Sequence, residues 1–571
     1  MTDKPWLASY PTGVPAEIDP DRYPSLAALF EASFQRYADA PAFTNLGETL
    51  TFAEADRLSR AFAAYLQSLP ALSRGARVAV MLPNTLQYVV AMLGILRAGL
   101  VVVNVNPMYT QHELEHQLQD SGALAIVVLE NFAHTLSTAL PQTGIASVIV
   151  TRLGDHCGTL KRLAVNFAVK YVKRLVPPYR IPGAVAYRSA LEEGRSLAYV
   201  NPGLRGTDTA FLQYTGGTTG VAKGAQLTHR NMVANALQSA AWAGPFYDKD
   251  AGVVVTPLPL YHVYSLTANL LCFVELGGHN LLITDPRDMR AFLRQLRGTR
   301  FAFLTGVNTL FNGLLHAQEF AELDFSALRV VMGGGMAVQR EVAERWHAVT
   351  GVPIAQGYGL TEASPIVAAN PLDLTSFNGS LGVPFPSTEV AIFNEAGKRL
   401  GVDEVGEICA RGPQVMAGYW NRPDDTAKVL TGDGWLRTGD LGHIDPAGFV
   451  FMEDRKKDVI VVSGFKVYPS EVEDAAVRQP GVREAAAIGI PDAQSGEVVK
   501  LFVVRKDPSI TEAQVIAHAR ANLTGYKVPR KVEFMDELPK SNVGKVLRRE
   551  LKERETAGRP RGAPGAAVPP S

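Results

Sequence analysis

Hydrophobic positions in the first part of the chain follow helical and strand periods in turn. Apolar residues recur every three to four positions over 25–37 and again after Thr51, which predicts two amphipathic helices. Residues 77–82 form a short apolar run that predicts a buried strand. The most apolar stretch, 88–103, is interrupted by Arg97 and is shorter than the roughly 18 residues that suggest a membrane span. We therefore expect a buried helix followed by a strand in this stretch.

The pattern changes twice further along the chain. Strand and helix patterns alternate up to the glycine run at 333–335, which predicts α/β layers. From Gly379 short strands separated by turns replace them, and beyond the charged segment 454–458 strands and helices mix again. The predicted fold is thus a large, multi-part α/β N-terminal domain with a β-rich part and a small, mobile α+β C-terminal domain. We expect the boundaries at 1–454 for the large domain, 455–458 for a hinge, 459–555 for the small domain and 556–571 for a disordered tail.

The amino-acid composition and charge of the chain argue against some classes of function. The chain has 571 residues, too many for one ordinary core, and its 56 acidic and 56 basic residues balance, which gives no overall field for nucleic acid. The three cysteines are scattered without disulfide or metal spacing, as expected in a reducing compartment. The first residues, MTDKPWLASYPTG, contain no apolar run, so we expect no signal peptide. We expect a cytoplasmic protein that does not bind nucleic acid.

A glycine-rich segment at 214–225, which reads YTGGTTGVAKGA, is the first candidate for chemistry. Glycines allow a tight turn that points several N–H groups at one place, and threonines and a lysine add donors and charge. A predicted strand at 209–214 precedes the segment, and Thr228 is placed to cap a helix after it. The segment suits a polyphosphate; the alternative is a surface turn, and the Gly-Lys-Ser/Thr order of the P-loop is absent. Its candidate ligands are Tyr214, Thr215, Gly216, Gly217, Thr218, Thr219, Gly220, Val221, Ala222, Lys223 and Gly224.

The segment from His112 to His116 has the H-E-x-x-H spacing of zinc proteases and lies in a predicted helix. A third ligand is not evident in the sequence, and the stronger motifs belong to another chemistry. We therefore do not expect zinc here.

Four further segments contain glycine, hydroxyl and charged residues: GGGM at 333–336, QGYGLTE at 356–362, WLRTGD at 435–440 and PKSNVGK at 539–545. Each alone is consistent with an ordinary turn. In this order, together with the glycine-rich loop, they resemble the adenylate-forming superfamily of acyl-CoA synthetases, luciferases and peptide-synthetase adenylation domains. Up to about residue 555, the chain most resembles the bacterial long-chain fatty-acid–CoA ligases.

The resemblance implies roles for individual residues. Beside the glycine-rich loop, the residues expected to bind ATP or AMP are Gly334, Gly335, Gln356, Gly357, Tyr358, Gly359, Thr361, Asp440 and Arg455. Mg²⁺ is the implied cofactor, with Thr218 and Glu362 as its ligands; an oxygen ligand suits this hard cation. The residues expected to take part in catalysis are Lys545, Glu362, Thr361 and Lys223, with Lys540 as a solvated comparator. Lys457 corresponds to the hinge, and Ser463, Gly464 and Lys466 to the loop on the coenzyme A path.

The implied reaction has two steps. A fatty carboxylate attacks the α-phosphate of ATP to give acyl-adenylate and pyrophosphate, and the thiol of coenzyme A then displaces AMP. His262 and Tyr264 are expected to border the acyl site, although His262 would equally suit a packed core. Residues 258–267 contain no acid that could hold an ammonium group, which argues against an amino-acid substrate. The alternatives are a fatty acyl-AMP ligase or another carboxylate-adenylating enzyme that loads a carrier protein, and a non-catalytic lipid-binding protein. A homodimer is compatible with the sequence.

A basic segment forms the last feature. Residues 156–191 contain no acid, and basic residues alternate with apolar ones between Leu160 and Arg180. Such a pattern is typical of segments that bind an anionic membrane surface, and it would make the protein a peripheral membrane protein on the cytoplasmic face. An exposed helix with a solvated basic face is an equally good interpretation.

Overall fold

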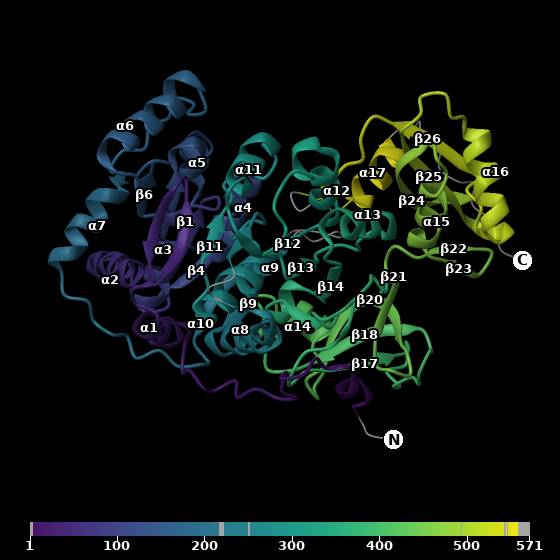
Figure 1. The fold of residues 1–571 in the computed structure, drawn as a ribbon, viewed down its shortest axis with the longest axis horizontal. Helices are drawn as coiled ribbons and strands as arrows, with labels where there is room; N and C mark the ends of the chain where they lie inside the picture. Colours follow the sequence, from purple (N-terminus) through teal and green to yellow (C-terminus); the bar gives the residue numbers. More distant parts are fainter. Residues whose placement is uncertain are drawn as a thin grey trace, which may run out of the picture.

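The computed structural model describes residues 4–215, 222–248, 252–492, 494–541, 544 and 546–557. The described chain forms a large body of β-sheets and helices and a compact C-terminal unit beside it (Figure 1). This arrangement confirms the predicted mixed α/β architecture with a large N-terminal and a small C-terminal part. Within the described ranges, every helix is too short or too polar to cross a membrane.

The first large sheet contains the strands on either side of the glycine-rich loop. Its central strands are parallel, whereas β9 returns antiparallel to β8, so that Thr215 and Lys223 face each other at the open end of this pair. The strand before the loop is as predicted, but β9 was not indicated by the hydrophobic pattern. In spatial order the strands are β19 (Gly418–Tyr419), β9 (Lys223–Thr228), β8 (Thr209–Thr215), β4 (Val101–Asn104), β3 (Arg77–Met81), β5 (Ala125–Leu129), β6 (Ser147–Thr151) and β7 (Val185–Ala186).

Helices with local capping signals cover this sheet. Thr51 and Thr110 each form a capping box with the glutamate three residues later, and the helix after Thr51 begins where the sequence predicts. Arg97, which interrupts the most apolar run, is fully buried but donates to Asp56 Oδ1 at 2.6 Å, so its charge is paired. The helices are α1 (Leu26–Arg36), α2 (Phe52–Ser68), α3 (Leu86–Arg97), α4 (Gln111–Ser121), α5 (Ala133–Ala139), α6 (Thr159–Phe167) and α7 (Tyr187–Ser196).

The second large sheet brings two of the motifs to neighbouring strands. β13 and β14 are parallel and end in the glycine run and the QGYG segment, with Gly333 opposite Gln356. In spatial order the strands are β16 (Val383–Pro384), β15 (Ile366–Ala369), β14 (Ile354–Gly359), β13 (Val330–Gly333), β12 (Phe301–Gly306), β10 (Val253–Thr256), β11 (Asn280–Leu282), β1 (Pro41–Asn45) and β2 (Glu48–Thr51). Its helices are α8 (His229–Ala243), α9 (Val263–Ser265), α10 (Cys272–Leu276), α11 (Met289–Leu296), α12 (Asn308–His316) and α13 (Arg340–Thr350).

Two antiparallel units complete the fold. The β-rich part predicted after Gly379 is a sheet of β17 (Glu389–Phe393), β18 (Gly406–Arg411), β20 (Leu436–Ile444) and β21 (Val450–Arg455), with α14 (Pro423–Val429) between its strands in sequence. The C-terminal unit contains β22 (Ile460–Val462), β23 (Phe465–Val467), β24 (Val482–Asp492), β25 (Gly496–Arg505), β26 (Lys531–Met535), α15 (Pro469–Val477), α16 (Glu512–Asn522) and α17 (Arg548–Ala557). Helix α17 continues to Ala557, two residues beyond the expected end of the small domain.

The hydrophobic cores follow this division. One cluster joins residues of both large sheets and the β-rich sheet, such as Val80, Leu282 and Ile408. Two clusters in the C-terminal unit consist only of residues from Ile460 onward. The unit therefore has cores of its own, and the boundary at 455–458 stays a prediction.

Candidate functional site

The strand ends around the glycine-rich loop are anchored by Tyr214. Its hydroxyl donates to Asp120 Oδ2 at 2.6 Å, and Arg422 holds the other oxygen of Asp120 at 3.2 Å. A Cβ at Gly224 would lie 3.1 Å from the Tyr214 ring, so glycine lets the returning strand pass this ring. Thr215 and Ala222 are described at the loop's two ends. The loop residues Gly216, Gly217, Thr218, Thr219, Gly220 and Val221 lie outside the described residues.

Tyr419 connects the phosphate loop with the expected magnesium ligand. Its hydroxyl donates to Glu362 Oε1 at 2.6 Å, and the Lys223 ammonium lies 5.3 Å from its ring centroid. Lys223 also pairs with Asp425 at 2.9 Å, and this pair lowers the pKa of the Asp425 carboxyl. Burial and the nearby Glu362 raise the pKa of Tyr419, so that its hydroxyl stays a donor. The structure thus brings Lys223 and Glu362, from separate motifs, to one tyrosine, with Thr361 adjacent in the short 3₁₀ turn Thr361–Ala363.

Tyr419 was not among the residues expected from sequence. It reaches the site because β19 pairs with β9, with Tyr419 opposite Ala225. The only sequence signal is an aromatic pair, Tyr419 and Trp420, after a glycine, and such a pair is as common in a core as in a site.

Asp440 and Tyr358 form a buried polar pair beside this cluster. The Tyr358 hydroxyl donates to Asp440 Oδ2 at 2.7 Å, and both side chains are buried. Burial raises the pKa of Tyr358 and Asp440 raises it further, so the hydroxyl keeps its proton. Asp440 Oδ1 is buried without a hydrogen bond among the described residues, although Arg455 Nε lies 3.1 Å away. An unused carboxylate oxygen here suits a hydroxyl-bearing ligand.

The Gln356 side chain is bonded at both ends to backbone groups, and its expected contact with the nucleotide stays a prediction. Its amide oxygen accepts the Val338 N–H at 2.7 Å, and its amide nitrogen donates to the Ser380 carbonyl at 2.8 Å. Both ends of the side chain therefore hold the surrounding loops in place. Gly357 and Gly359 lie on the same strand and pair with Ala369 and Ile366.

Tyr264, which is expected to border the acyl site, packs against the glycine run at 333–335. A Cβ at Gly334 would lie 3.0 Å from the Tyr264 ring, and the Tyr264 hydroxyl donates to the Met332 carbonyl at 3.2 Å. Gly335 has φ of 75°, which a side chain would strain. Burial lowers the pKa of His262 to about 4, and its Nδ1 accepts the Tyr264 N–H at 3.3 Å. His262 is thus neutral and caps the short helix α9.

The PKSNVGK loop of the C-terminal unit reaches the large body. Lys540 and Val546 close it as an antiparallel bridge, and a Cβ at Gly544 would lie 2.5 Å from Thr309 Oγ1, at the start of α12. Lys545 lies outside the described residues. Lys540, the expected solvated comparator, is partly exposed and pairs with Glu484 at 2.7 Å.

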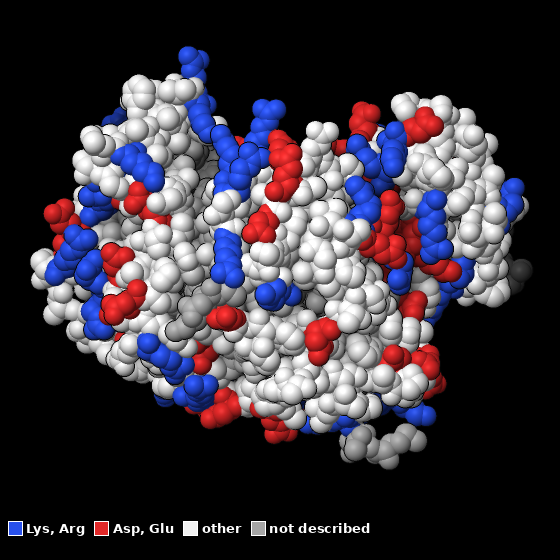
Figure 2. Space-filling model, in the orientation of Figure 1, with Lys and Arg blue, Asp and Glu red and all other residues white. Residues whose placement is uncertain are grey.

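The expected hinge residue lies in the linker after β21, and the expected coenzyme A residues lie in the C-terminal unit. Lys457 follows the end of β21, and burial lowers its pKa, followed in size by the effect of Arg455. Ser463 and Gly464 form the exposed two-residue turn between β22 and β23, with φ of 51° and 84°. Lys466 pairs with Glu395 of the large body at 3.5 Å. Acidic and basic side chains alternate along this junction (Figure 2).

The H-E-x-x-H segment forms helix α4, as expected. His112 is exposed, and Glu113 completes the capping box by accepting from the backbone N–H and the hydroxyl of Thr110 at 2.8 Å each. Its carboxylate is thus used in helix capping, which agrees with a structural interpretation of the segment.

Comparison with known proteins adds independent findings. Residues 30–420 match the model of the AMP-binding enzyme family, and residues 471–545 match the AMP-binding enzyme C-terminal domain. The chain is 56% identical over 550 residues to the long-chain-fatty-acid–CoA ligase of Escherichia coli O157:H7, covering 96% of this chain and 98% of that protein. It is 51% identical over 561 residues to the protein of the same name from Haemophilus influenzae, covering 98% and 100%.

Solved structures agree on the fold. The ATP-bound MatB of Rhodopseudomonas palustris superposes with a TM-score of 0.78 at 28% identity, covering 92% of this chain and 98% of that one. The anthranilate CoA ligase AuaEII in complex with anthranoyl-AMP superposes with a TM-score of 0.81 at 22% identity, covering 94% and 99%, and shows the fold alone.

Proposed function

The chain belongs to the AMP-binding enzyme family, and from this premise we propose that it is an ATP-dependent long-chain fatty-acid–CoA ligase. The observation that carries the proposal is the contact of Tyr419 with both Glu362 and Lys223, which joins two nucleotide motifs in one place. Relatives of the same length at 51% and 56% identity carry this activity in their names.

In the first step a fatty carboxylate oxygen bonds to the α-phosphorus of ATP, and the bond to the pyrophosphate oxygen breaks. The carboxylate is ionised near neutral pH, so positioning and charge neutralisation can carry this step without a strong base. Lys223 supplies a cation beside the phosphate loop, and Asp440 accepts from the ribose hydroxyls. Lys545, which follows Gly544 in the loop against Thr309, supplies a second cation to the carboxylate and the α-phosphate.

Mg²⁺ fits the donor set of this site. Glu362 offers carboxylate oxygen beside the phosphate loop, in the orientation that the Tyr419 hydroxyl fixes, and Thr218 is the expected second ligand. When bound, the cation supplies positive charge to the phosphate oxygens. Glu362 and Tyr419 hold its position.

In the second step the thiol sulfur of coenzyme A bonds to the acyl carbon and the bond to the AMP oxygen breaks. Residues 455–458 serve as the hinge, with Lys457 as pivot, between a large domain at 1–454 and a small domain at 459–555. His262 and Tyr264 border the acyl chain, and Tyr264 lies against Gly334, which places this border next to the expected nucleotide site.

An exchange assay tests the proposal. Radiolabelled pyrophosphate should enter ATP in the presence of long-chain fatty acids and not of amino acids, and addition of coenzyme A should give acyl-CoA and AMP in equal amounts. Exchange without thioester formation would identify an enzyme that loads another acceptor, and the absence of exchange with every acid would refute the proposal.

We also propose that the enzyme works as a peripheral protein at the cytoplasmic face of the membrane, where long-chain fatty acids partition. A homodimer stays a prediction.

A further inference from the structure

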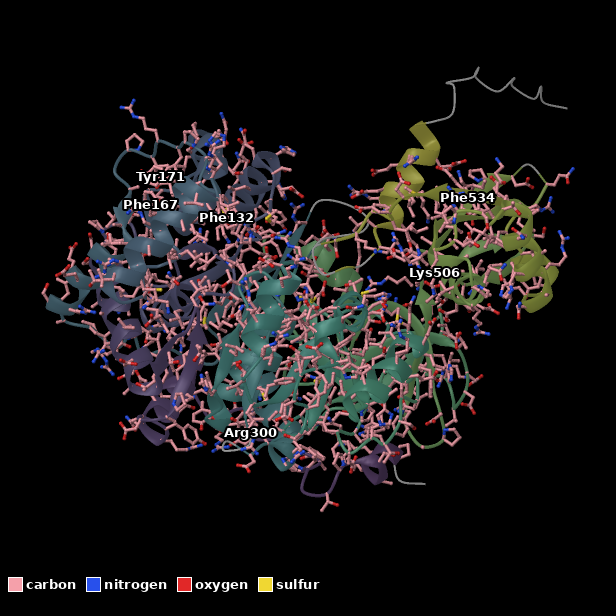
Figure 3. The ribbon with its side chains drawn as sticks, turned by 45° about the horizontal axis from the view of Figure 1, so that its top comes forward. Phe132, Phe167, Tyr171, Arg300, Lys506 and Phe534 are labelled. Atoms are coloured by element: carbon pink, nitrogen blue, oxygen red, sulfur yellow. The ribbon has the colours of Figure 1, made fainter. Side chains whose placement is uncertain are left out.

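Helix α6 and the π-helical turn Ala168–Val172 that continues it present an apolar face to solvent. Leu160, Leu163, Phe167 and Tyr171 follow one another at spacings of three or four, so they share one side of the helix. Their side chains are 84%, 61%, 59% and 61% exposed. Figure 3 shows Phe167 and Tyr171 at the outer edge of the molecule, where their ring centroids lie 5.1 Å apart.

This concentration of exposed apolar side chains is local. Val172 and Leu175 add to the same surface, which makes six of the fifteen exposed large apolar side chains of the described chain within residues 160–175. Because scattered single apolar residues are normal on a surface, the clustering at one helix is the informative observation.

The opposite side of the segment is fixed to the protein. Val169 is buried, and Asn166 Oδ1 accepts the Gly154 N–H at 2.9 Å. After the helix, the Leu175 N–H donates to the Val169 carbonyl at 3.0 Å, and Asn131 donates to the Leu175 carbonyl at 3.2 Å. The apolar face is therefore held outward by a seated helix.

Basic side chains surround this face. Residues 156–191 contain no acid, and Lys170, Lys173, Arg174 and Arg180 carry charge beside the apolar residues. The Lys170 ammonium lies 5.8 Å from the Tyr171 ring centroid. In Figure 2 the corner of the molecule that α6 occupies is mostly uncharged, with basic side chains around it.

We propose that residues 159–175 form a bilayer-docking surface, in which Leu160, Leu163, Phe167 and Tyr171 enter the headgroup–acyl boundary and Lys170, Lys173 and Arg174 contact anionic lipid phosphates. The proposal rests on the proposed function, since a long-chain fatty acid is drawn from the bilayer. An amphipathic segment lying in the interface needs an exposed apolar stripe with cations at its margins, and this segment has both.

Charge selects the bilayer over a second copy of the chain. A symmetric contact through this face would place the same cations of both copies against each other, with no acid in 156–191 to neutralise them. An anionic lipid surface is complementary to both parts of the face.

Sedimentation with lipid vesicles tests the charge component. The purified full chain is mixed with vesicles containing phosphatidylglycerol or with phosphatidylcholine alone, and binding should favour the anionic vesicles and weaken with salt. The variant K170Q/K173Q/R174Q should lower the partition coefficient by about fivefold per charge, about a hundredfold in total. The matched control R294Q/R300Q/K506Q removes the same charge elsewhere, with two of its sites labelled in Figure 3, and should bind like the unmodified protein.

Substitutions on the apolar face test immersion. L163S/F167S should weaken binding in high salt as well, and the control V402S/V405S, at exposed apolar positions elsewhere, should not. A tryptophan at Phe167 should be quenched by brominated lipid, and one at Val402 should not. Binding that neither set of variants changes, or an unquenched Phe167→Trp, overturns the proposal.

Two measurements separate the other outcomes. If L163S/F167S alters the oligomeric state in sedimentation velocity without changing vesicle binding, the face is a self-contact and the proposal is overturned. Vesicle binding requires no turnover, so a protein that docks but forms no acyl-CoA refutes the proposed function alone. With a short, water-soluble acid as substrate, the docking variants should retain full activity.

Discussion

Replacement of Asp440 by Asn should weaken the use of ATP through its ribose. The two carboxylate oxygens differ in this structure, because Oδ2 accepts from Tyr358 and Oδ1 is buried without a hydrogen bond among the described residues. A hydrogen bond to a charged group contributes about 1.5–3 kcal/mol and a neutral one about 0.5–1.5 kcal/mol. The substitution turns the acceptor of two ribose hydroxyl hydrogen bonds from a charged group into a neutral one. The difference amounts to roughly 2–3 kcal/mol, or about a 30- to 150-fold decrease in kcat/KM for ATP.

The assay compares two nucleotides with two proteins. Pyrophosphate exchange is measured with ATP and with 2′,3′-dideoxy-ATP, for the unmodified chain and for Asp440→Asn. The dideoxy nucleotide has no ribose hydroxyls to donate, so the substitution should change its kcat/KM by much less. The substitution also leaves Arg455 without its carboxylate partner. This effect lowers kcat/KM for both nucleotides, so it cancels when the loss with ATP is divided by the loss with the dideoxy nucleotide.

A matched control keeps the Asp440 carboxylate but removes the hydrogen bond that orients it. Tyr358→Phe deletes the hydroxyl that donates to Asp440 Oδ2, so the loss should be that of one hydrogen bond to a charged group, about 10-fold. Equal penalties for ATP and the dideoxy nucleotide in Asp440→Asn would refute the ribose assignment and leave Asp440 as a partner of Arg455 only.

Three further predictions follow from named contacts. Tyr419→Phe removes the donor to Glu362 and should raise the Mg²⁺ concentration for half-maximal exchange about 10-fold, with the rate restored at saturating Mg²⁺; a rate loss that Mg²⁺ does not restore would contradict the positioning role. Lys545→Ala should slow adenylation on the order of 100- to 1000-fold while supplied acyl-adenylate is still converted to thioester, and equal loss in both half-reactions would disprove its assignment. Burial lowers the pKa of His229 from 6.5 to about 4. On acidification, this histidine is therefore protonated in the unfolded chain before it is protonated in the folded protein. The free energy of unfolding should fall as pH drops from 6.5 towards 4, by up to about 1.4 kcal/mol per pH unit. His229 Nδ1 accepts the Leu26 N–H, and His229→Gln should flatten the urea-unfolding profile in that pH range relative to the unmodified protein.

The features that sequence predicts well here are local. Thr51, Thr110 and Thr228 each cap a helix with a partner three residues later, and the helices begin where this spacing indicates. The contacts that sequence misses are long-range. Tyr419 meets Glu362, 57 positions away, only because β19 joins the sheet of the phosphate loop, and no periodicity encodes that pairing.

The partners of polar and charged side chains are the features that the sequence predicts least. Lys540 is partly exposed, as expected of a solvated loop residue, but it also pairs with Glu484 on β24 of the same unit, a partner that its sequence neighbours do not indicate. Gln356 has the position of a nucleotide ligand, yet its amide is taken up by the Val338 and Ser380 backbones. In both cases the partner is fixed by tertiary packing, so the identity of the residue alone does not decide its role.

The arrangement of the C-terminal unit bears on the order of the two half-reactions. Gly544 of its PKSNVGK loop lies against Thr309 in helix α12, while the Ser463–Gly464 turn is exposed. The two loops belong to one unit with its own cores, so we expect the unit to move as a body if the second loop replaces the first. The expected hinge, which joins the large body to this unit, begins at Arg455, and the Arg455 guanidinium lies 3.1 Å from Asp440. We therefore infer that the arrangement described serves adenylation, and that thioester formation requires the backbone at 456–458 to change.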